Sequence, residues 1–180
     1  MVILRLTMVG SLNLEGLTFV VADDAANFRK IAVGILRDFG ASTILEAKDG
    51  ESVLEILSRS QVDMVLCDTA LPGINGFKLT RKLRGDDNPH RYIPIVLLTS
   101  HTRQGNVERA RDSGSNVVVA KPLSPRSLYS RLQWAAENER GFIESPKYCG
   151  PDRRFKSEGP PAGGGRRAED SKDSNSESKP

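Results

Sequence analysis

The sequence predicts an α/β fold: a doubly wound parallel sheet of five strands with helices on both faces, followed by a disordered C-terminal tail. Short apolar runs alternate five times with longer segments in which apolar residues recur at helical spacing. Hydrophobic residues make up only 38% of the 180 residues, and the shortfall lies beyond residue 140. The chain is long enough for one domain of ordinary size and too short for two.

Each predicted strand is a run of β-branched or apolar residues. The five runs occupy residues 18–22, 43–47, 62–67, 94–99 and 116–120. The run at 94–99 is almost continuously apolar, a pattern typical of a strand buried on both faces of a parallel sheet. Parallel neighbours need crossover connections, which the segments between the runs are long enough to supply.

Five amphipathic helices are expected between and after the strands. Their apolar positions place them at 28–39, 50–59, 77–83, 105–112 and 125–135. Gly40 follows the first helix and is expected to terminate it. Ser124 precedes Pro125 at the start of the last helix, an order that favours a side-chain cap followed by proline at the first helical position.

The chain divides into four parts. Residues 1–14 form an N-terminal extension, 15–140 the folded domain, 141–156 a short extension with some apolar residues, and 157–180 a polar tail. The tail cannot bury enough apolar area to offset the entropy of ordering it, so we expect it to be disordered. Met8 is an alternative translation start in this interpretation, because the residues before the domain show no periodic pattern.

Composition argues against several classes of protein. Lys and Arg total 26 against 23 Asp and Glu, and the net charge of +3 is too small to indicate nucleic acid or an acidic membrane as the partner. No apolar stretch approaches the roughly 18 residues that span a membrane, and no signal-peptide pattern is present. Two cysteines cannot build a disulfide framework, so a cytoplasmic location is expected, with Cys67 as a buried thiol.

Polar residues stand where four of the five predicted strands end. Asp23 and Asp24 follow the first strand, Asp68 the third and Lys121 the fifth, while Thr99 ends the fourth. Because ligands bind beyond the carboxyl ends of the strands in such sheets, we expect these side chains to converge there. Three carboxylates in close proximity repel one another without a cation, and a ligand set of oxygen atoms favours Mg2+, with Mn2+ also suitable.

This combination of residues predicts a phosphoryl-transfer site in which an aspartate is the nucleophile. Asp68 is the expected acceptor, because it opens a loop punctuated by proline and glycine that leaves its carboxylate central. Asp23 and Asp24, side by side, are better placed as metal ligands. Lys121 and the hydroxyl group of Thr99 are expected to bind oxygens of the incoming phosphoryl group.

With these residues, the region from about 16 to 138 resembles the receiver domain of response regulators in two-component signalling, in particular the stand-alone chemotaxis type. The motifs that carry the resemblance are Asp23-Asp24, Asp68 with Leu71-Pro72 and Gly76 behind it, Thr99-Ser100 and Lys121-Pro122. The resemblance implies a flavodoxin-like fold with strand order 2-1-3-4-5 and a cis peptide bond before Pro122. It also implies a phosphoacceptor protein, not a classical enzyme.

The resemblance further implies partners and ligands. A histidine kinase or a histidine phosphotransfer protein donates the phosphoryl group, Mg2+ is required, and the backbone carbonyl of Ala70 joins the aspartates in the metal site. Output is expected through contacts with another protein, because no effector domain follows in the sequence. Members of this family usually have an aromatic switch residue three positions before the lysine, and this chain has Val118 there.

The short extension leaves a second function open. Its Tyr-x-Gly-Pro-Asp-Arg-Arg segment, residues 148–154, resembles an extension of some receiver-only proteins. Arg153 and Arg154 offer planar cations suited to phosphates, including those of cyclic di-GMP. The alternatives are therefore an adaptor or cyclic di-GMP-binding protein that acts through this tail, and a segment that only packs back on the domain. DNA binding has little support.

Overall fold

The computed structural model describes residues 14–100, 104–137, 141–145 and 148–152. The helices and strands of this part of the chain are β1 (Thr18–Ala22), α1 (Ala26–Asp38), β2 (Thr43–Ala47), α2 (Gly50–Arg59), β3 (Met64–Asp68), α3 (Gly76–Leu83), β4 (Ile95–Thr99), α4 (Gln104–Asp112), β5 (Val117–Ala120), α5 (Pro125–Glu137), β6 (Phe142–Ser145) and β7 (Tyr148–Pro151). The five predicted strands and five predicted helices are all present. The last two strands were not predicted.

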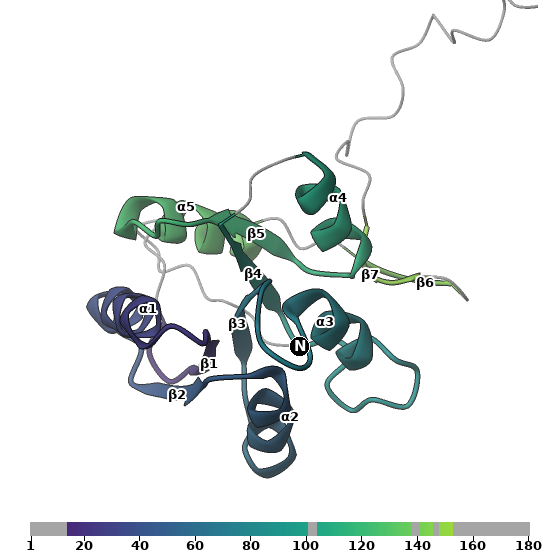
Figure 1. Cartoon of the computed structure of the whole chain (residues 1–180), viewed down its shortest axis with the longest axis horizontal. Helices are drawn as coiled ribbons and strands as arrows, with labels where there is room; N and C mark the ends of the chain where they lie inside the picture. The colour runs from purple at the N-terminus through teal and green to yellow at the C-terminus, as the bar shows by residue number, and fades with distance from the viewer. Residues whose placement is uncertain (1–13, 101–103, 138–140, 146–147, 153–180) are drawn as a thin grey trace, which may run out of the picture.

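Strands β1 to β5 form one parallel sheet in the order β2-β1-β3-β4-β5 (Figure 1). The register pairs Phe19 of β1 with Met64 of β3, and Asp68 of β3 with Leu98 of β4. The doubly wound fold and the strand order implied by the resemblance are therefore confirmed. β1 and β3 are neighbours although β2 lies between them in the sequence, so their carboxyl ends flank the switch point where such sheets bind ligands.

Helices cover both faces of the sheet (Figure 1). One face packs against α1 and α5, with Phe19 and Leu128 fully buried between the layers. The other face packs against α2, α3 and α4, with Val20 and Leu79 in its core. β3 and β4 are buried along their whole length, which explains the continuous hydrophobicity of β4.

Side chains near the helix ends act as the sequence predicts. Ser124 Oγ accepts a hydrogen bond of 3.1 Å from the backbone N–H of Ser127 in the first turn of α5. Asp49 and Asn75 cap α2 and α3 in the same way. Gly40 follows α1 with a φ of +91°. Local sequence therefore determines where these helices begin or end.

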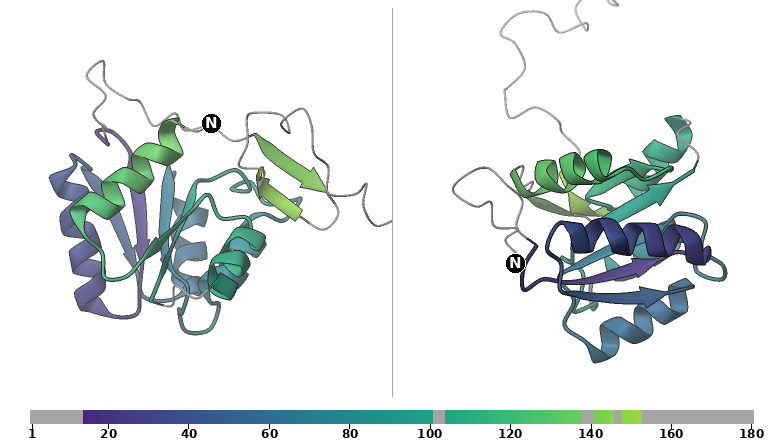
Figure 2. Two further views of the ribbon diagram at one scale, coloured as in Figure 1. Left: turned by 90° about the horizontal axis from the view of Figure 1, so that it is seen from above. Right: turned by 90° about the vertical axis from the view of Figure 1, so that its left-hand side faces the viewer.

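The short extension after α5 forms an antiparallel hairpin of β6 and β7, separate from the main sheet (Figure 2). The hairpin packs on the segment that follows α3 and on the turn before β5, at the amino ends of β4 and β5. The ring of Phe142 lies edge-on to that of Tyr92, with centroids 5.3 Å apart. The guanidinium group of Arg84 lies 5.1 Å from the centroid of the Phe142 ring. Regular secondary structure therefore continues beyond residue 140, where the folded domain was predicted to end. The division of the chain into domains stays a prediction.

The start of β3 and the burial of Leu14 differ slightly from the prediction. β3 begins at Met64 instead of residue 62, and the carboxylate of Asp63 accepts a hydrogen bond of 2.7 Å from the backbone N–H of Thr18. Leu14, assigned to the N-terminal extension, is fully buried in the core.

Cys67 is a fully buried free thiol as expected, and burial raises its pKa. None of the helices described is long and apolar enough to cross a membrane.

Candidate functional site

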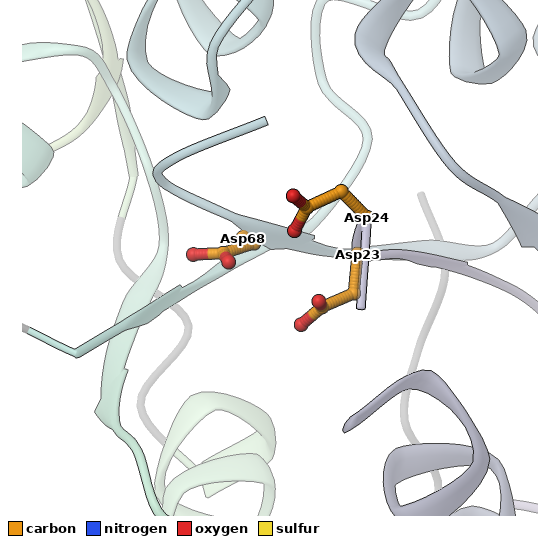
Figure 3. Close-up of side chains that lie close together, drawn as sticks. All are labelled: Asp23, Asp24 and Asp68. Atoms are coloured by element: carbon orange, nitrogen blue, oxygen red, sulfur yellow. The ribbon is translucent and has the colours of Figure 1, made fainter. Parts of the chain in front are cut away.

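Three aspartates meet at the carboxyl ends of the neighbouring strands β1 and β3 (Figure 3). Asp23 and Asp24 directly follow β1, and Asp68 is the last residue of β3. Carboxylate oxygens from the three side chains all lie within 4.8 Å of one another. Asp23 and Asp68 are buried, whereas Asp24 is exposed. The predicted convergence is present, and the cluster is open to solvent on the side of Asp24.

Lys121, which follows β5, reaches into the same cluster. Its Nζ donates hydrogen bonds to Asp23 Oδ2 at 2.6 Å and to Asp68 Oδ2 at 2.7 Å, and its side chain is 5% exposed. Burial by itself lowers the pKa of this ammonium group, but the hydrogen bonds to both carboxylates outweigh burial and raise the pKa above its ordinary value. Lys121 is therefore held in the charged form between two aspartates.

One ammonium group does not balance three carboxylates. Arg29 donates to the backbone carbonyl oxygen of Asp23 at 2.7 Å and forms an ion pair with Glu46 at 2.9 Å, so its charge is directed to Glu46. The cluster consequently carries a surplus of negative charge, and its donor atoms are all oxygens. Both properties fit a hard divalent cation such as Mg2+.

The loop after β3 orients the carboxylate of Asp68. The backbone N–H of Ala70 donates to Asp68 Oδ1 at 3.2 Å, while Lys121 contacts the other oxygen. Gly76 begins α3 where the loop returns to the strand, and a Cβ atom there would lie 2.4 Å from the backbone oxygen of Asp68. Only glycine allows α3 to approach this closely, so Gly76 has a packing role beyond its role as a loop signal.

Thr99 lies beside Lys121 at the same edge of the sheet. It is the last residue of β4 and is 3% exposed, and its carbonyl oxygen accepts a hydrogen bond of 2.7 Å from the backbone N–H of Lys121. The peptide bond between Lys121 and Pro122 is cis, as the resemblance implied. The structure thus places all five residues at the carboxyl edge of the sheet, with the side chains of Asp23, Asp24, Asp68 and Lys121 in one cluster.

Phe28 is a neighbour of the site that sequence reasoning missed. Its ring centroid lies 4.7 Å from Lys121 Nζ, and the residue is 37% exposed. In the sequence it is one apolar position of an amphipathic helix, and its only sign of a different role is its closeness to Asp24 along the chain. Because α1 begins at the carboxyl edge of the sheet, an aromatic residue in its first turn reaches the site.

A groove of about 410 Å³ opens behind Thr99, between β5 and the helices α4 and α5. Val118 of β5 lines the groove, as do Arg111, Arg131 and Trp134. Val118 stands at the position of the aromatic switch residue implied by the resemblance. The groove therefore places Thr99 next to a surface with apolar and basic side chains.

Two residues singled out in the sequence are not part of this picture. Arg153 and Arg154 lie outside the described residues, and their role in binding a nucleotide or another anion stays a prediction. The hairpin that precedes them lies at the amino ends of the strands, and the aspartate cluster lies at the carboxyl ends.

Comparison with known proteins agrees with the geometry. Residues 19–133 match the family model described as the response regulator receiver domain. The chemotaxis protein CheY-3 of Vibrio cholerae is 27% identical over 118 residues, which cover 66% of this chain and 90% of that protein. The chemotaxis protein CheY of Pseudomonas aeruginosa is 28% identical over 122 residues, which cover 68% of this chain and 98% of that protein. The family match ends before β6.

Solved structures show the same architecture. Chemotaxis protein CheY4 of Vibrio cholerae superposes with a TM-score of 0.60 at 25% identity, covering 67% of this chain and 99% of that one. The receiver domain of the sensor histidine kinase PA1611 of Pseudomonas aeruginosa gives a TM-score of 0.58 at 28% identity, covering 66% and 95%. The PA1611 structure has a magnesium ion coordinated in its active-site cleft.

Proposed function

Because this chain belongs to the response regulator receiver domain family, we propose that Asp68 accepts a phosphoryl group from a histidine kinase or a histidine phosphotransfer protein. The observation that carries the proposal is the cluster of Asp23, Asp24 and Asp68 with Lys121 at the carboxyl ends of the strands. Receivers of the CheY type are signalling proteins and not classical enzymes. The adaptor and cyclic di-GMP alternatives are not favoured by these comparisons.

In the proposed reaction, a carboxylate oxygen of Asp68 attacks the phosphorus atom of a phosphohistidine. The P–N bond breaks, an acyl phosphate forms on Asp68, and the donor imidazole keeps the electron pair of the broken bond and takes up a proton. Lys121 already contacts Asp68 Oδ2, so a short movement of its ammonium group reaches a phosphoryl oxygen. The hydroxyl group of Thr99, at the end of the adjacent strand, donates a hydrogen bond to another phosphoryl oxygen.

The three aspartates and the backbone carbonyl of Ala70 are the groups that would hold Mg2+, with Mn2+ as a substitute. The bound cation supplies charge neutralisation for the phosphoryl oxygens. The surplus of negative charge in the cluster supports this assignment, and so does the magnesium ion in the active-site cleft of the PA1611 receiver.

The groove behind Thr99 is the proposed output surface. It links the end of β4 to Trp134, which is the single tryptophan of the chain. A hydroxyl group of Thr99 that turns toward a phosphoryl group alters the packing of the groove wall, so the phosphorylated and unphosphorylated proteins present different surfaces. Tryptophan fluorescence therefore reports the change directly, and it is expected to respond to phosphorylation.

Intact-mass spectrometry tests the acceptor. Incubation with acetyl phosphate and Mg2+ is expected to add one phosphoryl group to the wild-type protein and none to Asp68→Asn. Asp87→Asn is the matched control, because Asp87 is an exposed aspartate in the segment after α3. Removal of Mg2+ by a chelator is expected to abolish the gain in mass and the fluorescence response together.

Two outcomes contradict the proposal. One is a wild-type protein that gains no phosphate under these conditions. The other is a phosphorylated protein in which Asp68→Asn leaves the gain in mass unchanged, because the acceptor would then be a different residue.

A further inference from the structure

Phe28 combines two features that an ordinary surface residue of a helix does not share. It is a large aromatic side chain that stays 37% exposed, and its ring lies over the ammonium group of Lys121 at 4.7 Å from Nζ. Phe28 belongs to the first turn of α1, which begins two residues after Asp24. The ring is therefore placed at the rim of the aspartate cluster by the backbone, not by packing in the core.

The ammonium group of Lys121 has three N–H donors. Two of them are used by Asp23 Oδ2 and Asp68 Oδ2. The ring of Phe28 offers its negative face to the same cation. A third carboxylate in this position would compete with Asp68 for the ammonium group, whereas an aromatic ring attracts the cation without taking it away.

Exposure supports the same assignment. Lys121 is at the edge of the sheet, yet its side chain is only 5% exposed. The carboxylates of Asp23 and Asp68 account for one side of the ammonium group, and the Phe28 ring lies within the contact range of a cation–π pair. The ring thus restricts both the movement of the ammonium group and the access of water to it.

Building on the proposed function, we propose that Phe28 is a positioning residue for phosphoryl transfer. Its ring holds the ammonium group of Lys121 next to Asp68, so that the cation needs only a short movement to pair with the incoming phosphoryl group. Without the ring, water solvates the ammonium group, and the group loses its fixed direction. Phe28 acts through Lys121 and does not itself contact the reacting atoms.

Ile31 provides the matched control. It lies one turn further along α1 and is the more exposed of the two residues at 47%. A general effect of changing an exposed apolar residue of α1 would appear equally in Ile31 and Phe28 variants. An effect through Lys121 would appear only in Phe28 variants.

The contact is tested by NMR on the metal-free protein, with no phosphoryl donor present. Aromatic ring currents are expected to shift the Hε and ammonium proton signals of Lys121 in the wild type and in Phe28→Tyr. The shift is expected to be lost in Phe28→Leu, which keeps the apolar bulk but removes the ring, and to be unchanged in Ile31→Val. Signals of Lys121 that are the same in Phe28→Leu and wild type would overturn the inference.

The role is tested by the rate of phosphorylation with acetyl phosphate and Mg2+. Phe28→Leu is expected to lower the rate constant roughly fivefold, the size that a cation–π contact of ordinary strength allows. Phe28→Tyr is expected to restore the wild-type rate, and Ile31→Val to leave it unchanged. Equal rates for Phe28→Leu and wild type overturn this inference alone. A wild-type protein that accepts no phosphate overturns the proposed function, and the role of Phe28 in transfer with it.

Discussion

At the carboxyl ends of the strands Lys121 is buried against two carboxylates, whereas at the amino ends Arg84 is buried against neutral groups. The guanidinium group of Arg84 donates to the carbonyl oxygens of Gly114 (3.0 Å) and Arg91 (2.6 Å) and to Asn116 Oδ1 (3.0 Å), and it lies over the ring of Phe142. Arg84 is 4% exposed, and burial lowers the pKa of its guanidinium group to about 10. The pKa of Lys121, in contrast, is raised.

The difference in partners indicates different roles: Lys121 belongs to a site that exchanges ligands, and Arg84 belongs to a contact that holds parts of the chain together. The negative charge of the carboxylates around Lys121 exceeds the positive charge of its ammonium group. We therefore expect the site to accommodate other cations as well as this ammonium group. Arg84 supplies the hydrogen-bond donor for the backbone carbonyl oxygens of Gly114 and Arg91, and the Phe142 ring covers the guanidinium group. We therefore expect changes at Arg84 to affect stability and changes at Lys121 to affect ligand binding.

The largest expected effect is that of Arg84→Met. The variant keeps an unbranched apolar stem but leaves the carbonyl oxygens of Gly114 and Arg91 without their donor, at a cost of about 3 kcal/mol in the free energy of unfolding. Urea unfolding of the full chain measures the loss. Arg81→Met, at an exposed position of α3, the helix that ends just before Arg84, is expected to change stability by no more than about 0.5 kcal/mol. Similar losses in both variants would show that the Arg84 contacts contribute nothing.

Gly114→Ala is expected to separate the hairpin from the domain. Gly114 has a φ of +93°, and a Cβ atom there would lie 2.4 Å from the backbone oxygen of Cys149 in β7. Relief of this clash requires the hairpin to move, at a cost of about 1–2 kcal/mol. The thiol of Cys149, now half-buried, is expected to react faster with a thiol reagent, while fully buried Cys67 stays protected.

The control for this variant is Gly105→Ala in α4. Outside its own helix, no atom of the described residues lies within 4 Å of a Cβ atom at Gly105, and its φ is not in the left-handed region. This variant is expected to leave the reactivity of Cys149 unchanged. An unchanged reactivity in Gly114→Ala would mean that the hairpin is not held by this close approach.

Lys121→Met is expected to strengthen Mg2+ binding about tenfold, because the variant removes a cation that competes for Asp23 and Asp68. Isothermal titration calorimetry measures the affinity. The same substitution is expected to slow phosphorylation, since the phosphoryl group loses its lysine partner. Lys78→Met, on the exposed face of α3, is the control and is expected to leave both quantities unchanged. Weaker Mg2+ binding in Lys121→Met would show that the lysine and the metal do not compete.

The smallest effect concerns the rim of the hairpin. Tyr92 Oη donates a hydrogen bond to Glu144. This bond, and to a smaller extent burial, raises the pKa of the phenol above its ordinary value of 10.0. A group with a raised pKa stabilises the folded form below its unfolded pKa, and the contribution is lost as the pH rises through the folded pKa. Contact of the hairpin with Tyr92 is therefore expected to weaken only above about pH 10.

The NMR signals of β6 measure this transition. They are followed from pH 9 upward, so that the range includes the pKa of roughly 10 of a free phenol. Tyr92→Phe keeps the ring that packs on Phe142 but has no proton to lose, so its β6 signals are expected to stay constant over the same range. A transition that persists in Tyr92→Phe would have another origin.

Most of the fold could be predicted because local patterns determine it. The apolar runs are buried strands, and Ser124 caps α5 where the sequence places it. The order of the strands was implied by the resemblance to receiver domains, because doubly wound connections by themselves allow more than one order. The site was predictable for the same reason: parallel strands place Asp23, Asp68 and Lys121 at one edge whatever the details of packing. Apart from the strand order, these inferences need only the period of the apolar residues and the direction of the strands.

The contacts of Phe28 and of the hairpin were decided by the tertiary structure. The ring of Phe28 lies over an ammonium group 93 positions away in the chain, and Gly114 lies against the backbone of β7. Both contacts depend on the angles at which helices and strands pack. No periodic pattern records such angles, because they result from the summed packing of many side chains. The sequence by itself determined the sheet, its helices and the residues at its carboxyl edge. Only the folded chain determined that each end of the sheet buries a cation, one with carboxylate partners and the other with neutral ones.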